Sequence, residues 1–222
     1  MGAKTSLVAH VQGDARAILA ARPALQHEET VDLVSALFPH LSLDAPRPAD
    51  LSCTYFSDRS IAAGRFPGLQ VVVSEEVAVD CPSQLSPRFI AAQGTTVLHL
   101  MHSVVDWFAF AVWQDGRLVR SLSLSPDGGV VEDIGERLAF ERPFWEGKHP
   151  AVAAGEDPAG YPLPFHPLEL GEAALREFFG FQLEGYVDAA LLDPESIPLL
   201  RFDEARTAAA SSAGKKPWWK FW

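Results

Sequence analysis

The segment that most constrains the fold lies near the middle of this 222-residue chain. Residues 107–113 are aromatic and β-branched, Asp115-Gly116 follows, and residues 117–124 alternate in character. A two-residue type I′ turn prefers Asp-Gly, because both of its central residues need a positive φ. The pattern therefore predicts a β-hairpin over residues 107–124. Since an isolated hairpin is only marginally stable in water, the rest of the chain must extend and cover it.

Other segments supply further strands and helices. Apolar, β-prone runs predict strands over residues 4–11, 51–56, 69–73 and 97–101, and Val130-Val131 opens another short one. Apolar periodicity and end signals predict helices over residues 15–21, 28–38 and 168–179, with Asp14 as an N-cap and Gly180 after the last helix. Proline-containing residues 44–50 and proline-rich residues 142–167 are expected to be loops.

Together these elements predict an α+β fold in a single domain. We expect a mixed, mostly antiparallel sheet with helices packed on it, spanning residues 1–204. The hairpin should lie at its centre, with core residues Phe108, Phe110, Leu118 and Leu122, and with Leu118 on the same face as Leu122 and Leu124. Residues 205–214 are small and polar, which is typical of a flexible linker. Residues 215–222 then form an aromatic and basic tail.

The charge balance excludes some classes of partner. The formal net charge is -11 and the pI about 5.0, so the body repels phosphate backbones and anionic lipid surfaces. We therefore expect no nucleic-acid partner, and we rank membrane association last. No run approaches 18 apolar residues, and two cysteines form neither a disulfide framework nor a metal cage. The expected location is the cytoplasm.

His99, His102 and Asp106 form the first candidate catalytic group. On a helix, the spacing H-x2-H-x3-D would gather all three side chains for metal binding or acid–base chemistry. On a strand, His99 and His102 would point to opposite faces, and the group would separate. The run 97–101 favours the strand, and two hydrogen-bonded structural histidines are then the simpler interpretation. His166 is a further catalytic candidate, because the N-terminus of a helix favours a neutral imidazole that could act as a base.

The C-terminal tail is the candidate binding segment. Three of the six tryptophans lie in the last five residues, and three lysines lie beside them. Aromatic and basic side chains supply anchor area and complement an acidic partner. The expected binding residues are Trp218, Trp219, Lys220, Phe221 and Trp222.

The chain resembles a family of small bacterial proteins that is known only as a domain of unknown function. The resemblance rests on Met1-Gly-Ala-Lys-Thr5 and on residues 98–107 running into Phe110-Ala-Val-Trp113. It continues in residues 121–127, in Pro143-Phe-Trp145 and in residues 161–171, and covers residues 1 to about 202. It implies a compact bacterial cytoplasmic domain, and it brings no activity, cofactor or catalytic residue with it.

Two hypotheses about function follow. The first is a non-catalytic binding protein whose tail docks on a protein partner or on another copy, since no known catalytic motif is present in the sequence. The alternative is an enzyme with a histidine–carboxylate hydrolytic site, in which a metal could assist. The sequence identifies no cofactor for either hypothesis.

Overall fold

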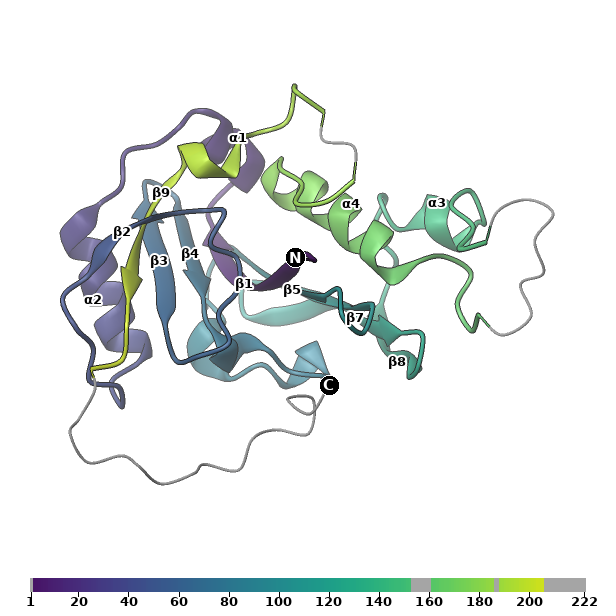
Figure 1. Ribbon diagram of the computed structural model, residues 1–222, viewed down its shortest axis with the longest axis horizontal. Helices are drawn as coiled ribbons and strands as arrows, with labels where there is room; N and C mark the ends of the chain where they lie inside the picture. The colour runs from purple at the N-terminus through teal and green to yellow at the C-terminus, as the bar shows by residue number, and fades with distance from the viewer. Residues whose placement is uncertain (1, 153–160, 186–187, 206–222) are drawn as a thin grey trace.

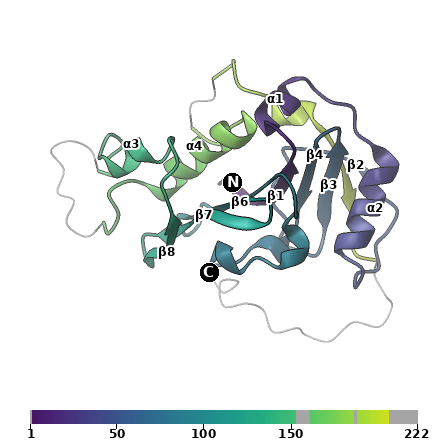
Figure 2. The same cartoon turned by 180° about the vertical axis from the view of Figure 1, so that it is seen from behind.

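The computed structural model describes residues 2–152, 161–185 and 188–205, which build one nine-stranded antiparallel sheet (Figures 1 and 2). The order of the strands across the sheet is β2-β9-β3-β4-β1-β5-β6-β7-β8. Their bounds along the chain are β1 (Lys4–Val11), β2 (Arg47–Asp50), β3 (Ile61–Phe66), β4 (Leu69–Val73), β5 (Thr95–His102), β6 (Trp107–Gln114), β7 (Arg117–Ser125), β8 (Gly129–Gly135) and β9 (Pro198–Phe202).

Helices lie on both sides of this sheet. The α-helices are α1 (Ala15–Ala20), α2 (His27–Leu37), α3 (Arg142–Trp145) and α4 (Pro167–Phe179). The 3₁₀ helices are η1 (Glu75–Val77), η2 (Pro82–Gln84), η3 (Pro87–Phe89) and η4 (Pro194–Ser196). In Figure 1, α2 lies at the left, beside β2 and β9, and α4 lies above β5 and β7; Figure 2 shows the same arrangement from behind. A large antiparallel sheet with helices agrees with the predicted α+β class.

The central strand, β1, is buried on both faces. Leu7 and Ala9 belong to the apolar cluster that includes Leu175 of α4, whereas Val8 belongs to the cluster that includes Val34 of α2. Successive side chains of a strand point to opposite faces, so both faces must be apolar here. The apolar residues Leu7, Val8, Ala9 and Val11 supply both faces, and the apolar, β-prone run over residues 4–11 predicted this strand correctly.

Two predictions for residues 44–56 are wrong. Residues 44–50 contain β2, whose Pro48 is tolerated because β2 is an edge strand of the sheet. Residues 51–56, predicted to be a strand, form a loop in which the Thr54 carbonyl accepts a hydrogen bond from the Ser6 amide. The intervening strand β3 was missed, because its sequence Ile-Ala-Ala-Gly-Arg-Phe has low intrinsic β-propensity. Hydrogen bonding to β4 and β9 on either side holds β3 in the strand conformation that its own sequence does not favour.

The predicted hairpin is present as β6 and β7, but its position and one of its faces differ from the prediction. It lies toward one end of the sheet, and β1 takes the centre. Phe108, Phe110 and Leu122 are fully buried as expected. Leu118, however, pairs with Trp113 and packs in the cluster on the opposite face from Leu122. A β-bulge between Val112 and Trp113 shifts the register, so the simple alternation fails there.

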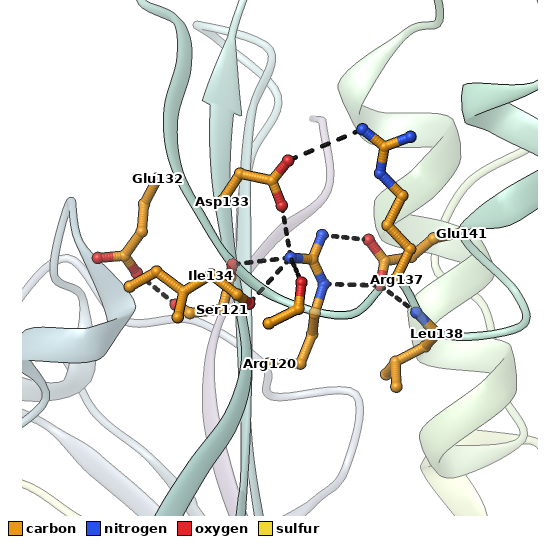
Figure 3. Close-up of polar contacts among 9 residues, drawn as sticks. Arg120, Ser121, Glu132, Asp133, Ile134, Arg137, Leu138 and Glu141 are labelled. Atoms are coloured by element: carbon orange, nitrogen blue, oxygen red, sulfur yellow. Dashed lines mark hydrogen bonds and ion pairs between the residues drawn. The ribbon is translucent and has the colours of Figure 1, made fainter.

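Arg120, on β7, anchors the edge strand β8 and the segment before α3 to the sheet (Figure 3). Its Nε and Nη2 atoms donate to the two oxygens of Glu141 at 2.9 and 2.6 Å, and both side chains are fully buried. Nη1 donates to the carbonyls of Ser121 and Ile134 and to Asp133. Glu141 also accepts from the Leu138 amide at 2.7 Å. A buried charge pair is tolerable only when its other hydrogen-bonding groups are satisfied in this way.

We expect Arg120→Met to lower the free energy of unfolding by about 3–5 kcal/mol, because it leaves the Glu141 carboxylate buried without its partner. Urea unfolding of the full chain measures the loss. Arg117→Met makes the same change at an exposed position of the same strand and should alter stability by less than about 0.5 kcal/mol. Equal effects of the two substitutions would contradict the anchoring role.

Candidate functional site

Helix α4 approaches β5 and β6 closely at Gly171. A Cβ atom at this position would lie 2.8 Å from the Met101 sulfur and 3.0 Å from the Phe108 ring. A larger residue fits only if the Met101 and Phe108 side chains or the helix shift. Glycine costs about 1 kcal/mol in a helix interior, so its presence here indicates a packing requirement. The close approach brings the Gly171 carbonyl within reach of a strand side chain.

That side chain is His99, which lies on β5 beneath α4. Its Nε2 is 2.9 Å from the Gly171 carbonyl oxygen, and its Nδ1 is 2.7 Å from the Thr5 hydroxyl. A carbonyl only accepts, so Nε2 carries the proton and Nδ1 accepts from Thr5. His99 is fully buried, and burial lowers its pKa from 6.5 to about 4. The imidazole is therefore neutral at pH 7, and both of its nitrogens are used within the fold.

His102 lies on the other face of β5 and does not join His99. Its ring meets Tyr55 edge-on, with centroids 6.1 Å apart. Burial and, after it, the nearby Lys4 lower its pKa. Its Nδ1 is buried and has no hydrogen-bond partner in the part of the chain that the structure describes. The strand separates the two histidines, as the spacing on a strand predicts.

Asp106 and His166 do come together. Asp106 ends the turn between β5 and β6 with φ at 47°, and His166 is the N-cap of α4. The His166 Nδ1 accepts from the Leu168 amide at 3.3 Å, and its Nε2 lies 3.6 Å from the Asp106 carboxylate. That distance is too long for a direct hydrogen bond but suits an ion pair when the imidazole is protonated. Two of the four predicted catalytic residues therefore converge.

Tyr161 joins this pair and was not predicted from the sequence. Its ring lies nearly parallel to that of His166, with centroids 6.2 Å apart. Its hydroxyl is buried without a partner among the residues described, and burial, followed by Asp106 and Glu169, raises its pKa. The only available signal was its place five residues before His166 in a proline-rich run. A carboxylate, an imidazole and a phenol therefore lie near one another, although no hydrogen bond among the described residues joins them.

Glu172 is a second residue that the sequence did not single out. Its side chain is buried against α4's own C-terminal continuation, where it accepts from the Leu183 and Glu184 amides at 2.9 and 3.0 Å. Burial raises its pKa to about 7 despite these two hydrogen bonds. The carboxylate thus holds residues 183–184 against the helix.

A groove opens on the opposite face of the sheet, between α2 and η3. Its floor consists of two cross-strand pairs of β1 and β4, which are Val8 with Val72 and His10 with Gln70. Its volume is about 160 Å³. The walls are apolar apart from one arginine and are formed by Leu33, Leu37, Arg88, Phe89, Ile90 and Ala91. Ligand pockets for cofactors or drug-sized molecules start at roughly 300 Å³, so the groove suits something smaller.

The remaining predicted site residues cannot be placed. Trp218, Trp219, Lys220, Phe221 and Trp222 lie outside the described residues. Within residues 2–152, 161–185 and 188–205, no three His, Cys, Asp or Glu side chains gather so as to hold a metal ion. No helix in these ranges is long and apolar enough to cross a membrane.

Glu172 predicts a pH effect on stability. Because its folded pKa of about 7 exceeds the ordinary 4.5, the folded state binds this proton more tightly, and the carboxyl costs stability as the pH rises from 4.5 to 7. Relative to the parent, Glu172→Gln should gain on the order of 3 kcal/mol between pH 4.5 and pH 8. Urea unfolding at both pH values measures this difference. The exposed Glu177→Gln on the same helix should follow the parent, and a Glu172 variant that also follows it would refute the prediction.

Comparison with known proteins identifies a family but no characterised relative. Neither the curated proteins nor the solved structures include a significant match to this chain. A family model described as a family of unknown function (DUF6928) matches residues 5–202, which takes in all nine strands except the first residue of β1. The chain therefore belongs to this family of unknown function, as the resemblance of its motifs predicted.

Proposed function

We propose that this chain is a non-catalytic binding protein of the bacterial cytoplasm, whose segment 215–222 docks on an acidic, partly apolar surface of a protein partner. The observation that carries the proposal is the segregation of charge along the chain. Four basic residues and no acidic ones follow position 205. The preceding residues hold the other 14 basic residues and all 29 acidic ones, a net charge of -15.

The aromatic content of the same segment supports a docking role. Trp218, Trp219, Phe221 and Trp222 concentrate large apolar surface in a few residues, next to lysines. Tryptophan dominates the binding energy of many protein interfaces, because it buries a large area for little loss of side-chain freedom. The positive charge of the lysines raises the rate of association with an acidic partner and favours acidic over basic partner surfaces.

The use of the core histidines supports binding over catalysis. His99 is neutral, buried and hydrogen-bonded at both nitrogens, so it has no free atom to offer a substrate. A catalytic base must lie within hydrogen-bonding distance of the proton that it removes. The group of His99, His102 and Asp106 therefore gives little support to a hydrolytic site.

Affinity capture tests the proposal. Full-length protein, a chain ending at Gly214 and a full-length Trp218→Ala/Trp219→Ala/Trp222→Ala variant are used as baits under the same conditions. We expect a specific partner that is retained by the full chain, lost with both variants and displaced by a peptide of residues 215–222. The triple variant keeps every lysine, so it separates anchoring by tryptophan from charge alone. Identical captures and identical oligomeric states for all three baits would end the proposal.

Hydrolysis remains the alternative, because Asp106 and His166 lie 3.6 Å apart beside Tyr161. If this cluster is catalytic, full-length protein should cleave simple activated esters, with a rate that falls by 10²-fold or more in His166→Asn. His10→Asn is the control, because His10 is bonded to the Gln93 carbonyl and is not part of this cluster. Activity equal in all three proteins, or at the level of buffer, would exclude this alternative for esters.

A further inference from the structure

The groove between α2 and η3 has the size and chemistry of a site for one aromatic side chain. An apolar cavity of about 150 Å³ accommodates a benzene ring, and this groove measures about 160 Å³. Leu33, Leu37, Ile90 and Ala91 are only partly buried, so its mouth faces solvent. An indole could insert one ring and leave the rest of its side chain at the mouth.

Polar groups at the groove are placed to complement an indole. Arg88 forms an ion pair with Glu76 on one side and lies over the Phe89 ring at 4.7 Å, so its guanidinium is held at the groove wall. A guanidinium also attracts the face of an incoming aromatic ring. Gln70 on the floor has no side-chain hydrogen bond to any of the described residues and offers an acceptor for an indole N–H.

The described chain ends beside the segment that follows α2. The Ala205 amide donates to the Ser42 carbonyl at 2.8 Å, and Glu204 pairs with Leu43, only a few residues after α2 ends at Leu37. From Ala205 to Trp218 the chain can span up to about 43 Å. The whole of α2, at 11 residues, is about 16 Å long, so the residues after Ala205 are numerous enough to span that distance within one molecule.

Charge also favours the same pairing. Helix α2 carries three acidic residues and no lysine or arginine, and Glu28, Glu29 and Asp32 are all exposed. Lys215, Lys216 and Lys220 flank the tail's first two tryptophans in the sequence. The acidic side chains of α2 therefore favour a lysine-containing segment over an acidic one as the occupant of the groove.

From these observations we propose that the groove between α2 and η3 binds Trp218 or Trp219 of the same chain, and so holds the tail back from its partner. This inference rests on the proposed function, because it assigns the partner-binding segment a resting place on its own body. Docking within one chain lowers the apparent affinity for the partner by the fraction of molecules in which the tail is free.

Methyl NMR of the full chain tests the docking directly. The spectra of the parent and of Trp218→Ala/Trp219→Ala are compared at two concentrations tenfold apart. We expect shift changes at the groove methyls of Leu33, Leu37, Val72 and Ile90, equal at both concentrations. In an Ala91→Leu background, whose added side chain fills the groove, the tryptophan substitutions should no longer shift these methyls. Ala92→Leu, the same change at the exposed neighbouring position, should preserve the response.

Three outcomes would overturn the inference: groove methyls that do not respond, responses confined to another face, or responses that grow with concentration, which indicate a second copy. The capture experiment keeps this failure distinct from that of the proposed function. Capture that depends on the tail without any groove response would leave the proposed function standing and this inference wrong. If the groove methyls respond but capture does not depend on the tail, this inference stands and the proposed function is wrong. When both hold, Ala91→Leu should capture more partner than Ala92→Leu.

Discussion

The contact between Gly171 and His99 is the constraint on which the arrangement of the candidate site depends. A residue without a side chain lets α4 lie this close to Met101 and Phe108 without displacing them, and at this distance the Gly171 carbonyl accepts from the imidazole. Because α4 is fixed there, its N-cap His166 lies beside Asp106 in the turn between β5 and β6. The same placement buries Glu172, which holds residues 183–184 against the helix.

Ionisable groups in the interior of this protein are used to join elements of the fold. Arg120 and Glu141 join β7 to the segment before α3, and Glu172 joins α4 to the chain that follows it. Burying each of these groups costs desolvation free energy, and hydrogen bonds to backbone groups offset part of that cost. Perturbed pKa values often mark functional sites, but structural networks produce them as well. Here, the contacts of His99 and Glu172 favour the structural explanation.

Local signals predicted the elements whose sequence carries them. The Asp115-Gly116 turn, the apolar run of β1 and the Asp14 and Gly180 caps all match the structure, and so does the separation of His99 from His102. Features that depend on tertiary pairing could not be predicted. Strand β3 is ordered by its neighbours, and the bulge that moves Leu118 to the other face is a register shift without a sequence signature. Tyr161 and Glu172 gained their roles only from the position of α4.

His99 is a neutral structural residue in this fold, and ¹⁵N NMR of its imidazole tests this most directly. We predict that the proton resides on Nε2 and that the ring does not titrate until the pH approaches about 4. Because this pKa lies below the ordinary 6.5, the stability that His99 contributes should be lost as the pH falls from 6.5 toward 4. A ring that titrates near pH 6.5, or that carries its proton on Nδ1, would contradict the account and return His99 to the catalytic candidates.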